Sequence, residues 1–345
     1  MRMRRVSIRG SARALALSAA AGIAVVIAIV IAVASDSYAR TQKPTLYAKS
    51  WLAITGKPLA ATAGARMFER GGNAVDAACA MLAATCTMWD TLAWGGETQA
   101  LVFNPHSGKV VGVNALGFAP AAASAEFFRA KGLRYPPEYG SLAAVTPGTP
   151  GGLFVMLAQW GKLSLADVLA PAIDLADGYP IEAELVGVIA RERERLSAWP
   201  FSRAVLLPRD GQPPEAGAMF RQPDLARTLR RLVEAEAKAL TLGKSRQDAI
   251  YAAYDLFYTG ELAREFVDAA RAEGALISRA DLAKWRVKLE EPVSTQYRGI
   301  DVYKLTTWTQ GPALLQALNL LEPVDVKGLG YNSARYVNTV SQALN

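Results

Sequence analysis

The chain has 345 residues, of which 51% are apolar and 20% charged, so it is too hydrophobic for a disordered chain and long enough to bury a substantial core. The formal net charge of +7 does not indicate a nucleic-acid-binding protein, because five of the 38 basic residues precede residue 14, where no acidic residue occurs. The remainder is close to neutral and carries no basic stripe, so we expect no nucleic-acid partner.

An uncharged apolar segment, residues 14–35, follows these arginines. At about 1.5 Å per helical residue it can cross the ~30 Å hydrocarbon layer, so we expect an N-terminal hydrophobic helix that contacts the membrane. Its length favours an uncleaved signal anchor, whereas Ala32–Ala34 would suit cleavage of a signal peptide. Either reading of residues 1–35 predicts a chain that faces the periplasm or exterior, or is secreted, after a polar linker at 36–50.

Two helices are predicted next. The first spans residues 57–70 and ends at a pair of glycines, and Asn73 caps the second, residues 74–88. Cys79 and Cys86 lie on this second helix with their Cα atoms ~10 Å apart, which is beyond the reach of a disulfide. We interpret them as small apolar residues of one helix face.

A β-hairpin is predicted after this helix pair, with strands at 99–103 and 109–115 and a turn at 104–108. His106, the only histidine of the chain, lies in the turn, where we expect it to be exposed. The sequence therefore contains no set of residues for a histidine-containing triad or a histidine-ligated metal site, and we predict no metal.

The next segments combine turns with helices. Residues 146–152 are rich in proline and glycine, so we expect an irregular run before a helix at 153–160. Ser164 is predicted to cap a further helix that Pro171 kinks and Gly178 ends.

Residues 180–290 are predicted to be mostly helical. Pro223 begins one helix, and the spacing of Ser278 and Asp281 is typical of a capping box that begins another. A second hairpin is expected at 294–304, followed by a helix at 311–321.

The last segment forms an apolar stripe at helical spacing that is still in phase where the sequence stops at Asn345. We interpret this as a chain that ends inside a structural element: a fragment, a split product or one half of a larger protein. The alternative is a terminal helix that frays.

A set of short motifs, in this order across residues 50–345, resembles the γ-glutamyltransferase (glutathione hydrolase) family. The motifs are Gly71–Ala78, Trp94–Gly96, Ala119–Pro120, Ala144–Gly148, Trp160–Leu163, Ala170–Ile173, Gln222–Ala226, Phe257–Gly260, Asp281–Ala283, Tyr297–Gly299 and Leu318–Glu322. Each motif is weak alone, but together they are specific.

The resemblance implies an α+β fold, the αββα sandwich of N-terminal nucleophile hydrolases. It implies a precursor that cuts itself, and a new N-terminal threonine that attacks a γ-glutamyl amide, with its own α-amine as the base and no metal or organic cofactor. In the family that threonine follows the Leu318–Glu322 motif by several dozen residues. Residues 51–345 would thus be an incomplete sandwich, a large-subunit region truncated before the nucleophile, so we predict no catalytic residue in this chain and a threonine-bearing small subunit as its partner.

One departure concerns the substrate. The family places an arginine for the substrate carboxylate before the Ala-Pro pair, with two residues in between, at the position that Leu116 occupies here. A leucine cannot form the two parallel hydrogen bonds that a guanidinium makes with a carboxylate. The alternative is that another arginine, such as Arg134, replaces it.

Three functions follow from this resemblance. The first is the large-subunit part of an amide hydrolase or acyl transferase acting on a γ-glutamyl or other small amide. The second is a membrane-tethered remnant or scaffold without catalysis. The third is a relative of the β-lactam acylases, in which the aromatic loop at residues 88–94 would line an apolar acyl site, or would simply pack.

Overall fold

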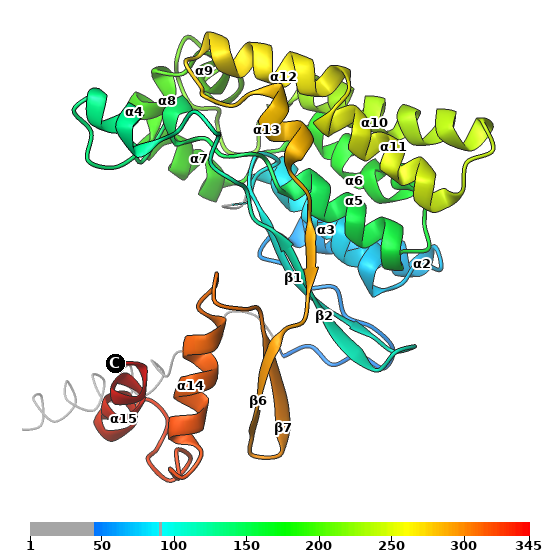
Figure 1. Cartoon of the computed structure of the whole chain (residues 1–345). Helices are drawn as coiled ribbons and strands as arrows, with labels where there is room; N and C mark the ends of the chain where they lie inside the picture. Colours follow the sequence, from blue (N-terminus) through cyan, green and yellow to red (C-terminus); the bar gives the residue numbers. More distant parts are fainter. Residues whose placement is uncertain (1–44, 90–91) are drawn as a thin grey trace, which may run out of the picture. The chain divides into compact units, whose positions relative to one another are not determined.

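A computed structural model describes residues 45–89 and 92–345 (Figure 1). The chain divides into two compact units, Met1–Ser50 and Trp51–Asn345. Within the first unit, residues 45–50 are exposed and form neither helix nor strand. The predicted anchor or signal peptide at 1–35 and most of the predicted linker lie outside the described residues. None of the helices that the structure describes combines the length and the apolar character needed to span a membrane.

The second unit is mainly helical, with short strands between the helices (Figure 1). The helices are α2 Pro58–Glu69, α3 Ala74–Met88, α4 Ala125–Ala130, α5 Thr149–Trp160, α6 Leu165–Asp177, α7 Ala183–Arg191, α8 Arg193–Ser197, α9 Pro200–Leu206, α10 Pro223–Thr241, α11 Arg246–Tyr258, α12 Glu261–Ala272, α13 Arg279–Lys284, α14 Gly311–Leu321 and α15 Ala334–Leu344. The strands are β1 Thr98–Asn104, β2 Lys109–Ala115, β3 Tyr179–Pro180, β4 Met219–Phe220, β5 Lys288–Glu290, β6 Val293–Tyr297 and β7 Ile300–Lys304.

Most of the predicted elements are confirmed. The α2–α3 pair turns at Gly71, whose φ of +81° suits glycine. Asn73 and Asp76 form a reciprocal capping box at the start of α3. Ser278 and Asp281 do the same at α13. Cys79 and Cys86 are both buried and free, as expected from their spacing.

The main sheet is antiparallel, in the order β1–β2–β5. Alternation along the strands places Val113 and Ala115 in the core, where β2 packs on α5. Leu101 and Phe103 point to the opposite face and are exposed. The predicted sandwich is present only in part, because the described residues otherwise form two-stranded ribbons, β3–β4 and β6–β7, and no second sheet of three or more strands.

The start of α5 corrects one prediction. Residues 149–152 are helical rather than irregular, with the proline in the first turn, where its missing N–H costs nothing. The two glycines of this turn allow close packing: a Cβ on Gly151 would lie 2.4 Å from the Trp285 ring, and one on Gly152 would lie 2.6 Å from Thr98. The glycines are therefore required by helix packing rather than by a turn.

Candidate functional site

The start of β1, the end of β2 and the start of α5 meet at one point, which we call the strand end (residues 96–98, 114–118 and 146–149). The carbonyl oxygen of Gly96 accepts hydrogen bonds from the N–H groups of Gly148 (2.7 Å) and Thr149 (3.0 Å). A Cβ on Gly148 would lie 1.9 Å from the carbonyl oxygen of Ala115, so the backbones approach as closely as glycine permits. The three segments thus form a fixed frame.

Leu116 lies in this frame, immediately after β2, and is partly buried. Its N–H donates to Asn114 Oδ1 (3.1 Å), and its carbonyl oxygen accepts from the indole Nε1 of Trp285 (2.9 Å). The next N–H, that of Gly117, donates to Glu97 Oε1 (3.1 Å). Hydrogen bonds on both sides therefore fix the backbone at Leu116, so we expect a substitution at this position to change the side chain and not the path of the backbone.

A buried tyrosine supports the same frame from the helical side. The hydroxyl of Tyr258 donates to the carbonyl oxygen of Pro147 (2.7 Å) and accepts from the N–H of Gly151 (3.0 Å). Its ring stacks on Trp285, with centroids 4.9 Å apart. Burial raises the pKa of Tyr258 well above its ordinary value, so the hydroxyl keeps the proton that it donates.

Two charged side chains reach the outer face of the sheet from β5. Glu290 Oε1 accepts from Trp308 Nε1 (2.6 Å) and Thr306 Oγ1 (3.3 Å), and Glu290 Oε2 lies 3.4 Å from Asn114 Nδ2. Lys288 pairs with Asn114 in the sheet, and its Nζ lies 5.3 Å from the centre of the Phe118 ring. No sequence motif marks this pair, because strand register alone brings residues 114 and 288 together.

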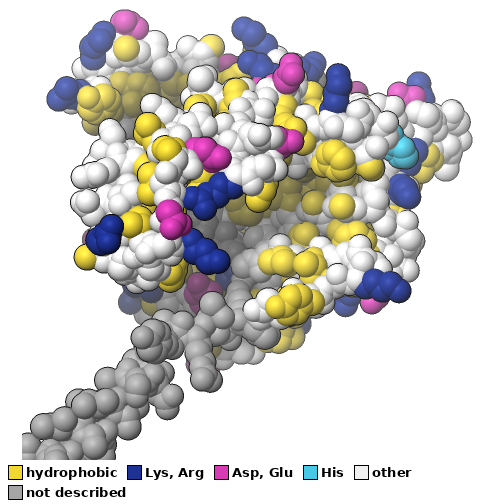
Figure 2. Space-filling model, turned by 90° about the horizontal axis from the view of Figure 1, so that it is seen from below, with side chains coloured by type: hydrophobic (Ala, Val, Ile, Leu, Met, Phe, Trp, Pro, Cys, Tyr) yellow, Lys and Arg dark blue, Asp and Glu magenta, His cyan; other side chains and the backbone are white. Residues whose placement is uncertain are grey.

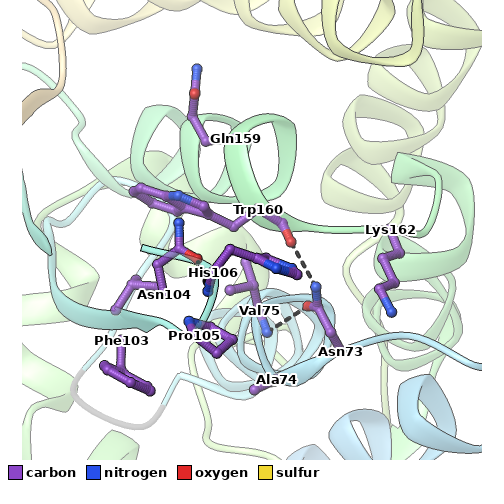
Figure 3. Close-up of a pocket in the computed structure, with 11 residues that line it drawn as sticks. Asn73, Ala74, Val75, Phe103, Asn104, Pro105, His106, Gln159, Trp160 and Lys162 are labelled. Carbon is purple, nitrogen blue, oxygen red and sulfur yellow. Dashed lines mark hydrogen bonds between the residues drawn. The ribbon is translucent and has the colours of Figure 1, made fainter. Parts of the chain in front are cut away.

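A separate pocket of about 470 Å³ lies at the other end of the hairpin, next to its turn at residues 105–108 (Figure 3). Asn73 fixes one wall, because its Nδ2 donates to the carbonyl oxygen of Trp160 (2.6 Å). Val75, Trp160 and Lys162 also line the pocket, together with His106 from the turn. β1 and β2 are seven residues long, so about 20 Å of strand separates this pocket from the strand end.

The two cysteines and the histidine lie in different surroundings. Burial raises the pKa of Cys86 to about 12, and burial together with the charge of Asp76 raises that of Cys79, so both thiols stay protonated and unreactive. His106 is exposed, as predicted, in a turn in which its own N–H donates to Asn104 Oδ1. No group of three or more His, Cys, Asp or Glu in residues 45–89 and 92–345 is arranged to hold a metal ion.

Two other predicted candidates lie as follows. Arg134 is exposed and stacks on its neighbour Tyr135 at 5.1 Å, and within the described residues its guanidinium makes no hydrogen bond to residues 114–118. In the aromatic loop, Trp94 Nε1 donates to Thr87 Oγ1 (3.2 Å), which ties the loop to α3. That this loop lines an acyl site stays a prediction.

A model of the family described as Gamma-glutamyltranspeptidase matches residues 60–345. The chain belongs to this family. The gamma-glutamyltranspeptidase structure from Helicobacter pylori superposes with a TM-score of 0.78 at 29% identity, covering 87% of this chain and 83% of that one. The cephalosporin acylase from Bacillus halodurans superposes at 0.73, also at 29% identity, covering 89% of this chain and 56% of that one.

Relatives of this gamma-glutamyltranspeptidase family member carry both kinds of name. The acylase ACY 1 proenzyme of Pseudomonas sp. (strain SE83) is 32% identical over 307 residues, 85% of this chain and 51% of the relative. The glutathione hydrolase proenzyme of Pseudomonas sp. (strain A14) is 28% identical over 312 residues, 89% of this chain and 51% of the relative. The chain therefore spans about half the length of these relatives.

Proposed function

We propose that the chain is the large-subunit portion of an amide hydrolase or acyl transferase whose nucleophilic threonine belongs to a separate half. The observation that supports this is coverage: the chain spans about half the length of relatives that are named proenzymes. The threonine Oγ would attack the amide carbon, its α-amine would take the proton, and the amine would leave with a proton as an acyl ester forms.

The surface of the chain is consistent with such a partner. Hydrophobic side chains gather around a hollow on the face shown in Figure 2. On the outer face of the main sheet, Phe103 is 62% exposed and Leu101 is 38% exposed. Exposed apolar side chains on a sheet face are typical of a surface that another layer covers.

Leu116 carries the proposal on selectivity. Its backbone is fixed in the strand end, where the family resemblance places the arginine for the substrate carboxylate. With leucine at this position, the site lacks a guanidinium group that could form two parallel hydrogen bonds with a carboxylate. We therefore propose that the site prefers γ-glutamyl donors less strongly than an arginine-bearing site would.

The test compares two amides, γ-glutamyl 4-nitroanilide and butanoyl 4-nitroanilide, which share the acyl chain but differ in the charged groups. The enzyme is the chain together with its threonine-bearing half. We expect hydrolysis of both, and we expect Leu116→Arg to raise kcat/KM for the γ-glutamyl amide roughly 10- to 100-fold while leaving the butanoyl amide little changed.

Leu242→Arg is the matched control. Leu242 is 71% exposed just beyond the end of α10, so this substitution adds the same charge at a position far along the chain from Leu116. Equal gains in both variants would show a general effect of charge and would contradict the role given to Leu116. Hydrolysis of no amide by the complete protein would favour the remnant or scaffold over the enzyme.

A further inference from the structure

A lysine lies on the same sheet face as the position of the missing arginine. Lys288 is the cross-strand partner of Asn114, and paired residues of antiparallel strands point to the same face. The contact between Asn114 Nδ2 and Glu290 Oε2 shows that the side chains of β2 and β5 meet on this face. Leu116 follows Asn114 by two residues, just beyond the end of β2, so strand alternation continued by one residue would turn its side chain toward this face.

The ammonium group of Lys288 is held at the rim of this site. Its Nζ lies 5.3 Å from the centre of the Phe118 ring, a distance at which a cation is attracted to an aromatic face. Phe118 is itself fixed, because its carbonyl oxygen accepts from the N–H of Thr146 (3.0 Å). The ring is 48% exposed, so the ammonium above it is open to a ligand.

The neighbouring carboxylates already have donors of their own. Glu290 accepts from Trp308, Thr306 and Asn114, and Glu97 accepts from the N–H of Gly117. Lys288 makes no ion pair with any carboxylate of residues 45–89 and 92–345. Its positive charge is therefore available to an anion at the strand end.

We propose that Lys288 is a specificity-determining residue that binds the carboxylate of the acyl group in place of the missing arginine. This inference rests on the proposed function and names its substrate class: amides whose acyl chain carries a carboxylate. An ammonium offers one point charge rather than a fixed fork, so this recognition is weaker and less directional than that of an arginine. It is also exposed, so salt weakens it.

The experiment uses the complete protein with its threonine-bearing half and the same two amides. For Lys288→Met, we expect KM for γ-glutamyl 4-nitroanilide to rise about tenfold, with kcat and all values for butanoyl 4-nitroanilide within about twofold of wild type. Lys288→Arg keeps most of the wild-type KM. In the wild type, added NaCl raises KM for the γ-glutamyl amide only.

Lys131→Met is the matched control, because Lys131 is an exposed lysine at the C-terminal end of α4 whose Nζ lies 5.2 Å from the centre of the Phe127 ring. Lys288→Gln repeats the measurement with a polar side chain in case methionine promotes aggregation.

The inference is overturned, while the proposed function stands, if the wild type hydrolyses only the butanoyl amide. It is also overturned if the wild type hydrolyses both amides and neither Lys288→Met nor Lys288→Gln changes the ratio of the two KM values. If the wild type hydrolyses neither amide, the proposed function fails first, and with it the role given to Lys288. A rise in KM for both amides would mean that Lys288 supports the fold of the site rather than the carboxylate.

Discussion

The two ends of the β1–β2 hairpin differ in how they are built. At the strand end, Gly148 and Ala115 bring two backbones together, and two partly buried hydrogen bonds fix the backbone of Leu116. At the turn end, a pocket of about 470 Å³ opens between the exposed turn and the first residues of α3. This pocket thus lies at the opposite end of the hairpin from Leu116, which the family resemblance singles out.

The largest expected effect tests the close packing of the strand end. Gly148→Ala places a Cβ 1.9 Å from the carbonyl oxygen of Ala115, and position 148 cannot move away without straining the hydrogen bonds from residues 148 and 149 to Gly96. We expect a loss of about 4 kcal/mol of unfolding free energy, measured by urea denaturation. Gly95→Ala is the control, in the loop before β1 and next to Gly96, where an added Cβ meets nothing within 4 Å. A loss for Gly148→Ala no larger than about 1 kcal/mol would show that the frame tolerates alanine at position 148.

The next effect tests the buried support beneath the turn-end pocket. The carboxylate of Asp76 is fully buried and accepts from the N–H groups of Asn73 (2.7 Å), Lys162 (2.9 Å) and Leu163 (3.0 Å). Asp76→Ala leaves these donors without an acceptor, so we expect a loss of about 3 kcal/mol. In the exposed first turn of α11, Asp248→Ala serves as the control and should cost well under half as much. A loss for Asp76→Ala below 1 kcal/mol would mean that water replaces the carboxylate.

The smallest effect concerns the turn itself. His106 is exposed, and the turn is held by a backbone hydrogen bond from the His106 N–H to Asn104 Oδ1, which survives when the imidazole is removed. We expect His106→Ala to change the unfolding free energy, measured by urea denaturation, by less than about 0.5 kcal/mol. We also expect it to leave kcat for both anilides unchanged. A large loss of activity in this variant would place chemistry at the turn end and reverse the comparison.

Local signals in the sequence predicted much of this fold. Helix caps such as Asn73 and Ser278, and the alternation of the hairpin strands, need only a few neighbouring residues to be recognised. The start of α5 was mispredicted because Gly151 and Gly152 look like a turn until Trp285 and Thr98 are packed against them. That information lies more than 50 residues away.

The candidate site could be predicted only in part for the same reason. Leu116 was found because a motif of adjacent residues marks the arginine position. Lys288 gave no signal, because an exposed lysine in a short polar strand resembles many others. Only the register of β2 against β5 brings it beside Asn114, and register depends on the whole sheet.

The box formed by Asn73 and Asp76 does more than begin a helix. Through Asp76 and the Asn73 amide it holds Trp160, Lys162 and Leu163, which come more than 80 residues later in the chain. Everything between them, including the whole strand end, is a closed loop tied at its base. A single proteolytic cut within that loop would leave the two fragments bound to each other. A cleaved molecule would therefore migrate as one species until it was denatured.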